Sequence, residues 1–461
     1  MFVREKQFYT TFFKLSAIMA AQNLLSYVVN LADNIMLGRY SEETLAAAAM
    51  VNQIHYLLQM ISIAGIGAGT LVMVSQYWGK GEIEPIRRII ALAMKFAAVT
   101  GFVFFAITFA MPGKVLSIFT NDEILRAQGI DYLRIMCFTY LIFPLQSVLA
   151  TSLRGARIVL IGTIVSVVSL FINISLNYLL IYGNYGFPEM GIKGAAIATL
   201  IARAAELAIV LAYVRFKDKK LQLRLLSFVK FDSFYLSDFI KVAAPVMLSG
   251  ASWGIGMMLQ IIILGHISGG IVAANSIAAT VYQVITAFAF GTCSSTSVIM
   301  GNTIGAGRLD NVRPYARTFQ LLYVLCGVAT GIVLFAVRYA ILSIYVLEQG
   351  TRDLALVFMN HLVWIVVFAS YQYPAASGIV LGGGNTKYPV IVETCFIWLC
   401  VLPLSALSAF VWKLSPIVTF LFLKSDQILK CIPNGIVVNR YKWVRILTRD
   451  SDPQPAEEQG T

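Results

Sequence analysis

The sequence predicts an all-α membrane protein with twelve transmembrane helices in two pseudo-symmetric six-helix bundles. Of its 461 residues, 58% are hydrophobic and only 13% are charged, whereas about a quarter of the residues in soluble proteins are charged. Twelve stretches are apolar and long enough to cross a bilayer as a helix, which takes roughly twenty residues. A pattern from the first half also recurs in the second half. These observations indicate a duplicated, membrane-embedded helical unit.

The twelve apolar stretches define the expected spans in chain order. Several exceed the minimum length, so we expect them to tilt or to extend past the headgroups. Their approximate bounds are 10–37, 45–77, 89–111, 130–151, 158–183, 190–214, 236–265, 270–303, 313–345, 353–381, 387–412 and 414–437.

Basic residues alternate between the loops that join these spans. One set of loops holds most of them, including Arg87, the run 215–230 and the run 430–449, whereas the opposite set holds few, such as Arg39 and Lys114. Because cytoplasmic loops carry the excess of Lys and Arg, both termini are predicted to be cytoplasmic, with the chain in the plasma or inner membrane. The net charge of +12 therefore reflects membrane orientation, and we expect no nucleic-acid partner.

An internal repeat relates the two halves at an offset of about 227 residues. DNIMLGRYSEETLAAAA begins at Asp33 and QIIILGHISGGIVAANS begins at Gln260, while SQYWGKGE corresponds to GNTIGAGR and LRG to LGG. Two repeats that run in the same direction imply a pseudo-twofold axis along the membrane normal and a cavity between the lobes. The predicted units are a first lobe at 1–214, a cytoplasmic linker at 215–235, a second lobe at 236–440 and a cytoplasmic tail at 441–461. We expect the final SDPQPAEEQGT to be disordered.

Asp33 needs an explanation because a charge in the hydrocarbon region is costly. Asn30, Ser26 and Asn23 follow at helical spacing, so this helix has a polar face. A second polar stripe runs along the fifth span through Ser166, Ser169, Asn173 and Asn177, and Thr199 follows on the sixth. We expect the two stripes to face each other inside the first bundle.

Such a group can couple transport to an ion. A buried carboxyl group can gain and lose a proton, and we predict an ion-coupling site of Asp33, Asn173, Asn177 and Thr199. Sodium is the other candidate, with oxygen ligands from Asp33, Asn173 and Thr199. The structural alternative is that Asp33 caps the helix end or makes an ordinary hydrogen bond.

The candidates for a substrate surface are aromatic, methionine and amide side chains on helices expected to face the cavity. Such side chains can hold flat organic cations by cation–π contact and adaptable apolar packing, although ordinary helix packing also uses them. They are Asn30, Tyr27, Tyr56, Trp253, Met257, Gln260, Tyr282 and Tyr371.

Other features favour structural roles. Glu393 lies about one turn into the eleventh span, where snorkelling explains it. Arg203 and Glu206 are three apart on the sixth span and predict a structural ion pair near the cytoplasmic side. The six cysteines lack metal or disulfide spacing. The helices contain no pattern for a nucleophile and its base, and no Walker motif, so we expect neither an enzyme nor an ATP-driven pump, and no cofactor besides the coupling H⁺ or Na⁺.

The chain resembles the multidrug and toxic compound extrusion family, the MATE transporters. The resemblance rests on DNIMLGRYSEETLAA, QYWGKGE, LNYLLIYGNYGFPEMGIKGAAIATLIAR, APVMLSG, GNTIGAG and LGGGNTKYP and covers nearly the whole chain. It implies two six-helix lobes and export of cationic, amphipathic compounds in exchange for protons or sodium. It also implies that Asp33 is the family's first-helix acid, with Asn173 and Thr199 in the polar group around it.

Several positions depart from the family pattern. Asn177 stands where several members have a second acid, and Ile18 replaces a first-helix proline that the second copy retains as Pro245. Trp253 and Ser370 occupy positions that are acidic in the subgroup with a second-lobe sodium site. The resemblance therefore implies coupling through the first lobe, without a two-carboxylate site, and puts a proline-driven bend of the first helix in doubt.

We therefore expect a monomeric antiporter that exports amphipathic, often cationic drugs in exchange for H⁺ or Na⁺ by alternating access. Its expected partners are small organic substrates and the lipid bilayer. The alternative is a flippase for a lipid-linked precursor, which would share the two-lobe architecture. A flippase should have a more cationic cavity and a lipid-facing groove.

Overall fold

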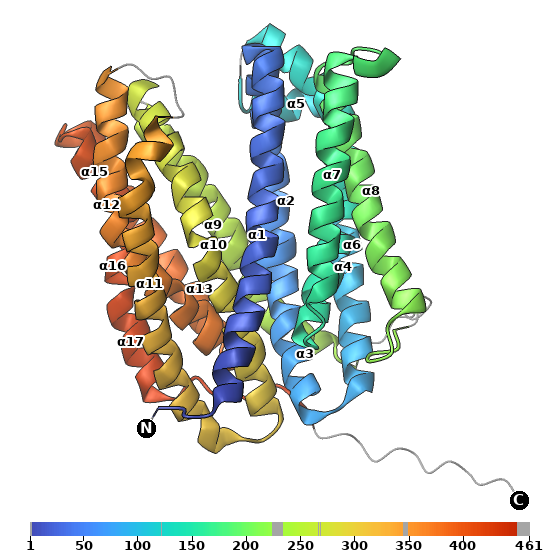
Figure 1. Cartoon of the computed structure of the whole chain (residues 1–461), viewed down its shortest axis with the longest axis vertical. Helices are drawn as coiled ribbons and strands as arrows, with labels where there is room; N and C mark the ends of the chain where they lie inside the picture. The colour runs from blue at the N-terminus through green and yellow to red at the C-terminus, as the bar shows by residue number, and fades with distance from the viewer. Residues whose placement is uncertain are drawn as a thin grey trace, which may run out of the picture.

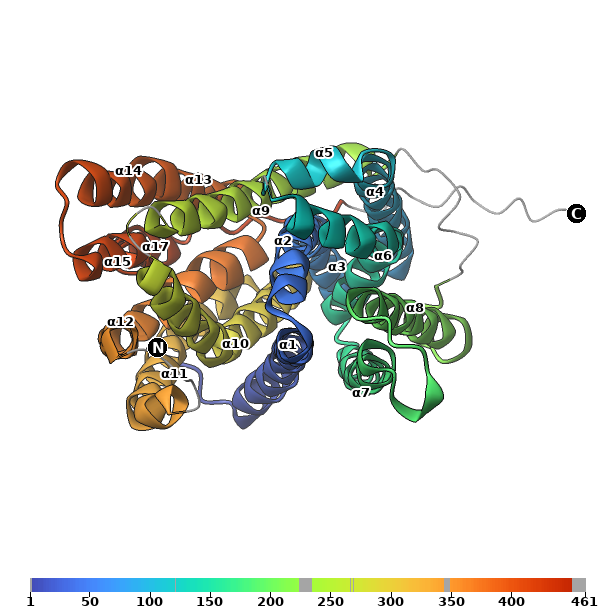
Figure 2. The same ribbon diagram turned by 90° about the horizontal axis from the view of Figure 1, so that it is seen from above.

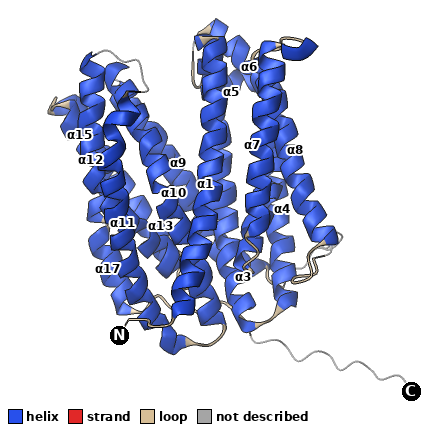
Figure 3. Ribbon diagram, in the orientation of Figure 1, coloured by secondary structure: helices blue, strands red, loops and turns tan. Residues whose placement is uncertain are grey.

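The computed structural model describes residues 2–120, 122–223, 234–265, 267, 269–343 and 349–449, which form helices and loops without strands (Figure 3). Eleven described helices are long and apolar enough to cross a membrane. The predicted fold class is confirmed. The middle of the predicted linker, 224–233, and the predicted disordered tail lie outside the described residues.

The two bundles lie side by side and diverge away from the end where both termini lie (Figure 1). We call the end that carries the termini the terminal face. The first bundle comprises α1 (Lys6–Tyr40), α2 (Glu42–Gln59), the π-helical segment Met60–Gly67, α3 (Ala68–Lys80), α4 (Ile83–Ala110), α5 (Pro112–Ser117), α6 (Glu123–Gly155), α7 (Leu160–Tyr182) and α8 (Ile192–Phe216).

The second bundle repeats this order of spans (Figure 2). It comprises α9 (Leu236–Gly265), α10 (Gly269–Gly305), α11 (Val312–Leu342), α12 (Gln349–Tyr373) with its π-helical continuation Pro374–Val380, α13 (Lys387–Cys395), α14 (Leu402–Ala406), α15 (Pro416–Lys424), α16 (Asp426–Leu429) and α17 (Cys431–Arg440). Two further π-helical segments, Phe396–Val401 and Leu407–Val411, flank α14.

Local sequence signals set several helix ends. Ser41 begins α2 because its side chain accepts a hydrogen bond from the Thr44 amide at 3.4 Å. Asp122 does the same for α6 through the Ile124 amide at 2.8 Å. Gly183 ends α7 with a φ of 68°, a left-handed conformation that glycine adopts readily.

The twelfth predicted span, 414–437, consists of three consecutive helices, α15, α16 and α17. The backbone at the junctions Ser425 and Lys430 stays in the right-handed helical region, and hydrogen bonds such as Leu429 amide to Ser425 carbonyl span them. Three charged residues, Lys424, Asp426 and Lys430, occur around these junctions.

The bundles have separate apolar cores at one end and a shared core at the other. Buried side chains between Leu37 and Ile192 form a first-bundle core, and those between Leu264 and Leu423 form a second-bundle core. At the terminal face, however, Phe12 and Val159 pack in one cluster with second-bundle residues such as Phe319. The bundles are therefore joined at the terminal face and independent at the opposite end.

Close helix packing joins the bundles at the terminal face. A Cβ atom at Gly305 of α10 would overlap the main-chain oxygen of Gln76 on α3. The side-chain nitrogen Nδ2 of Asn302 donates to the Ser75 carbonyl at 3.0 Å, and Arg157 Nε donates to Asn302 Oδ1 at 2.7 Å. Small residues allow this approach, as in other membrane helix pairs.

Residues 441–449 form an extended strap across the terminal face. The Arg445 amide donates to Gly383 of the second bundle at 2.8 Å. Gln76 of the first bundle donates to the Arg445 carbonyl at 3.0 Å and accepts from the Leu447 amide at 2.7 Å. Trp443 anchors the strap, with only 1% of its surface exposed. The strap therefore ties the two bundles together.

The end of the strap makes further polar contacts with both bundles. The Arg449 amide donates to the Tyr77 hydroxyl at 3.0 Å, and Arg449 Nε donates to Asp238 Oδ2 at 2.6 Å. The hydrogen bond to Asp238 raises the pKa of Arg449. Both contacts stabilise the closed terminal face.

Replacing Gln76 with leucine should loosen this closure. The change removes both side-chain hydrogen bonds to the strap, and each contributes about 1 kcal/mol. We expect about tenfold faster maleimide labelling of a cysteine placed at Thr11, which lines a terminal-face pocket of about 330 Å³. The background would lack native cysteines. Gln128→Leu is the matched control because Gln128 bonds to Glu43 within the first bundle; equal labelling in both variants would contradict the role of the strap.

Candidate functional site

The structure brings together the four residues predicted for ion coupling. Asn177 donates through its side-chain nitrogen to Asp33 Oδ1 and, at 3.2 Å, to Asn173 Oδ1. Asn173 in turn contacts Thr199 Oγ1 at 3.5 Å. The chain of contacts runs from α1 through α7 to α8, so Asp33 of the first polar stripe meets Asn173 and Asn177 of the second inside the first bundle.

The geometry follows from helical spacing and two flanking contacts. Asn173 and Asn177 are four residues apart on α7 and share one face. Toward the terminal face, Gln22 of α1 donates to the Val159 carbonyl at 2.9 Å. At the other end, the Tyr182 hydroxyl donates to the Met36 carbonyl at 2.7 Å. Asp33 lies between these two ties, which hold α1 against α7.

Burial makes the polar group responsive to charge. Asn173 is 1% exposed and Asn177 is fully buried. Asn177 Oδ1 is buried without a hydrogen-bond partner among the described residues. An unsatisfied acceptor beside a carboxyl group can receive a proton donor if the amide turns, or contribute an oxygen to a cation. The group therefore has the chemistry to take up either a proton or a hard cation.

Two further side chains act on Asp33 electrostatically. The guanidinium of Arg203 lies within electrostatic range of Asp33, as does the phenol of Tyr132. Arg203 pairs with both carboxylate oxygens of Glu206 at 3.0 Å, as predicted. Arg203 lies midway along α8, however, and the expectation of a pair near the cytoplasmic side was wrong because α8 extends beyond it in both directions.

Other polar residues of the first helix lie apart from this group. Ser26 donates back to the Gln22 carbonyl at 3.1 Å. Asn30 is exposed and has no hydrogen bond to any described residue that would place it with Asn177. The first helix itself is continuous from Lys6 to Tyr40, consistent with isoleucine at position 18.

Some predicted substrate residues meet between the bundles. The rings of Tyr56 on α2 and Trp253 on α9 are 6.1 Å apart, and Tyr27 lies within electrostatic range of Tyr56. Met257 and Gln260 follow Trp253 at helical spacing on α9 and are partly buried. This aromatic group, Tyr27, Tyr56 and Trp253, forms the contact between the bundles on the side away from the strap.

Two predicted substrate residues do not join this group. The Tyr282 hydroxyl contacts Gln427 Oε1 at 3.4 Å inside the second bundle. The Tyr371 hydroxyl contacts Gln320 Oε1 at 2.9 Å, also within the second bundle. Helical spacing does not distinguish a face that lines a central cavity from one that packs inside its own bundle.

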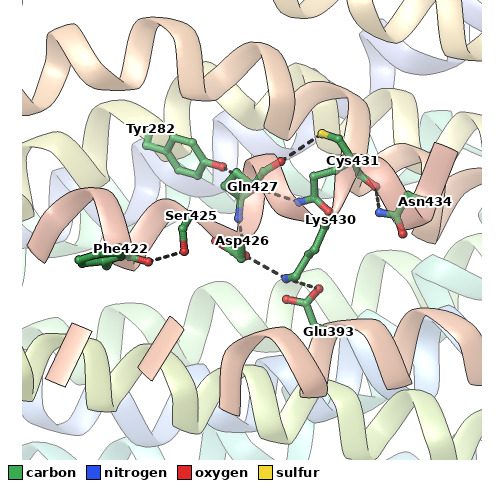
Figure 4. Close-up of polar contacts among 10 residues, drawn as sticks. Tyr282, Glu393, Phe422, Ser425, Asp426, Gln427, Lys430, Cys431 and Asn434 are labelled. Carbon is green, nitrogen blue, oxygen red and sulfur yellow. Dashed lines mark hydrogen bonds and ion pairs between the residues drawn. The ribbon is translucent and has the colours of Figure 1, made fainter. Parts of the chain in front are cut away.

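The sequence interpretation missed a charged network in the second bundle (Figure 4). Lys430, which we assigned to a cytoplasmic loop, is fully buried. Its ammonium is 2.8 Å from Glu393 Oε2, so the snorkelling explanation for Glu393 was wrong as well. Three charges inside the twelfth expected span were the available signal, since intramembrane ionisable residues usually mark functional sites.

The fold and the polar group define a two-lobed membrane transporter rather than an enzyme. The family model described as MatE matches residues 19–179 and 245–407. The chain belongs to this family, and the resemblance seen in the sequence is confirmed.

Similar proteins cover almost the whole chain. It is 26% identical over 446 residues to a "Probable multidrug resistance protein NorM" of Thermotoga maritima, covering 95% of this chain and 94% of that protein. It is 24% identical over 380 residues to "Probable multidrug resistance protein YoeA" of Bacillus subtilis, covering 82% and 81%.

Solved structures share the fold. A MATE crystal structure in complex with MaL6 superposes with a TM-score of 0.85 at 16% identity, covering 93% of this chain and 95% of that one. An outward-facing multidrug resistance MATE transporter of the MOP superfamily has the same TM-score, identity and coverage.

Proposed function

We propose that this chain is a secondary antiporter that exports amphipathic organic cations in exchange for H⁺ or Na⁺. The observation that carries the proposal is the buried contact chain from Asp33 through Asn177 and Asn173 to Thr199. Relatives named as multidrug resistance proteins support the substrate class.

The arrangement of the bundles supports alternating access. The positive-inside rule assigns the terminal face to the cytoplasm, so the shared core and the strap close the cytoplasmic side. The separate cores at the other end leave the bundles free to diverge toward the outside. We assign this conformation as outward-facing, with Asp33 on the outer half of the first bundle.

Coupling requires the ion and the drug to favour different states. An ion bound at Asp33 changes the hydrogen bonds between α1 and α7, because Asn177 must then turn its amide or share its oxygen. Release of the ion to the cytoplasm would restore the contact seen here. The drug would be released outward when Asp33 is occupied.

Dye export from everted vesicles tests the proposal. An imposed pH gradient or sodium gradient, applied separately, should drive a cationic dye into vesicles that contain the protein, and collapse of that gradient should stop uptake. Vesicles without the protein are the control. Dye uptake that responds to neither gradient would contradict antiport.

One observation bears on the flippase alternative. An apolar groove of about 540 Å³ lies between α9 and α13, with Lys241 and Lys387 among its lining residues. The inner cations Arg203 and Lys430 are paired with carboxylates, whereas Asp33 forms no ion pair with a described residue. The carboxyl group of Asp33 would repel an anionic lipid headgroup and favours a cationic substrate.

A further inference from the structure

Lys430 is held between two carboxylates inside the second bundle (Figure 4). Its ammonium is 2.8 Å from Glu393 Oε2 on α13 and 2.9 Å from Asp426 Oδ2 on α16. The side chain of Lys430 is only 1% exposed. A buried ammonium requires compensation, and here two carboxylates supply more than one positive charge needs.

Asp426 is held in this network by neighbours on the same span. Gln427 Nε2 donates to Asp426 Oδ2 at 2.8 Å, and Gln427 Oε1 accepts from Gln372 Nε2 of α12 at 2.8 Å. The Asp426 carboxylate also interacts with the ammonium of Lys424, which lies 5.4 Å from the Tyr282 ring centroid. Asp426 is thus fixed directly by its own span and indirectly, through Gln427, by α12.

Glu393 differs from Asp426 in its exposure. Its side chain is 26% exposed, compared with 9% for Asp426. Glu393 lies within electrostatic range of Tyr373, and Tyr373 lies within the same range of Tyr27 and Tyr56. Tyr373 is therefore the aromatic side chain that has both the partly exposed carboxylate and the two phenols of the first bundle within electrostatic range.

We infer that Glu393 is a binding site for the cationic group of the transported substrate, with Lys430 as its counter-ion while the site is free of substrate. The inference rests on the proposed export of organic cations. A quaternary or protonated amine takes the place of the Lys430 ammonium at Glu393. Lys430 then remains paired with Asp426, so its buried ammonium keeps one carboxylate partner.

The surroundings favour an organic cation over a small inorganic one. Tyr373 supplies an aromatic ring within electrostatic range of the carboxylate, and aromatic rings attract organic ammonium groups by cation–π interaction. The ring of Tyr373 is held edge to face against Phe290 at 4.7 Å. The second bundle thus contributes the charge that recognises the substrate, and the first bundle contributes the ion-coupling acid.

A matched pair of variants tests this assignment. Glu393→Gln removes the proposed site. Asp353→Asn is the matched control, because Asp353 is an exposed acid of the second bundle that hydrogen-bonds to Gln349 at 3.4 Å and lies outside the Lys430 network. The probes are an N-methylated styrylpyridinium dye, which is permanently cationic, and its unmethylated neutral parent at alkaline pH. Fluorescence titration of the full-length protein in nanodiscs gives both dissociation constants.

We expect Glu393→Gln to bind the cationic dye about tenfold more weakly than wild type, with a much smaller change for the neutral dye. Asp353→Asn should keep the wild-type ratio of the two constants. Export of the cationic dye should show the same difference in KM between the variants.

Three results would contradict the inference. If the wild type binds and exports the cationic dye and both variants have the same ratio of constants, the site at Glu393 is wrong while the proposed function stands. A wild type that binds only the neutral dye would contradict both the site and the proposed export of organic cations. A wild type that neither binds nor exports the cationic or the neutral dye would overturn the proposed function together with this inference.

Discussion

Replacing Asp33 with asparagine is expected to abolish ion-driven export. Asparagine has nearly the same shape as aspartate but carries no charge and does not titrate, so it can neither exchange a proton nor attract sodium. The contact with Asn177 can be retained as an amide–amide hydrogen bond. The fold should therefore persist while the coupling is lost, and gradient-driven dye uptake into everted vesicles should fall to the level of vesicles without the protein.

The control is the same substitution at a surface acid of the same bundle. Asp131 pairs with Lys193 at 3.1 Å, and both side chains are largely exposed, so Asp131→Asn should cost at most about 1 kcal/mol of stability. Equal amounts of both variants in the membrane would show that insertion is intact. Undiminished export by Asp33→Asn would refute the coupling assignment.

The ion-coupling group was predictable because it depends on local periodicity. Asn173 and Asn177 are four residues apart, so any helix places them on one face. Asp33 on a neighbouring apolar helix needs a polar partner, and the fifth span offered the longest polar stripe. A single register of α1 against α7 brings these residues together.

The second-bundle network was not predictable by the same reasoning. Lys430 was grouped with the basic residues that follow it, because a continuous twelfth span ending near 437 would place it close to the membrane boundary. In the structure Lys430 is instead buried against Glu393, which comes from a different helix. A pair formed between separate helices depends on tertiary packing, which no spacing rule in one helix contains.

The strap could not be predicted from the sequence, for a related reason. Residues 441–449, YKWVRILTR, mix basic and apolar side chains without a helical pattern, and we assigned them to the cytoplasmic tail. Trp443 is the residue that contradicts this, because burying a side chain of this size is strongly favourable. Its pocket is provided by Gly383, whose missing side chain admits the indole ring.

The Asp33 group and the Lys430 network show how the two copies of the repeat differ. At corresponding positions the first bundle has Asp33 and the second has Gln260, so the symmetry is broken where coupling is proposed. The second bundle has its own intramembrane acid, Glu393, on a different helix. The two lobes thus share a scaffold but differ in chemistry, which would allow ion and substrate to act on different bundles of one rocking unit.

Replacing Gly305 with alanine is expected to shift the protein away from the conformation described here. The new Cβ would overlap the Gln76 carbonyl oxygen across the interface between α10 and α3, and main-chain atoms cannot move aside as a flexible side chain can. Overpacking of this kind costs about 1–3 kcal/mol. Because the contact exists only while the terminal face is closed, the cost falls on that state alone and leaves the opposite state unaffected.

A conformational equilibrium shifted by about 1–3 kcal/mol changes by about 5- to 150-fold. The expected readout is correspondingly faster maleimide labelling of a cysteine at Thr11, measured in the background without native cysteines. Gly254→Ala is the matched control: it also lies on a helix of the second bundle facing the first, but its Cβ would meet the Leu57 methyl at an ordinary 3.6 Å. If Gly305→Ala labels no faster than Gly254→Ala, the close approach of α3 and α10 does not determine which side of the transporter is closed.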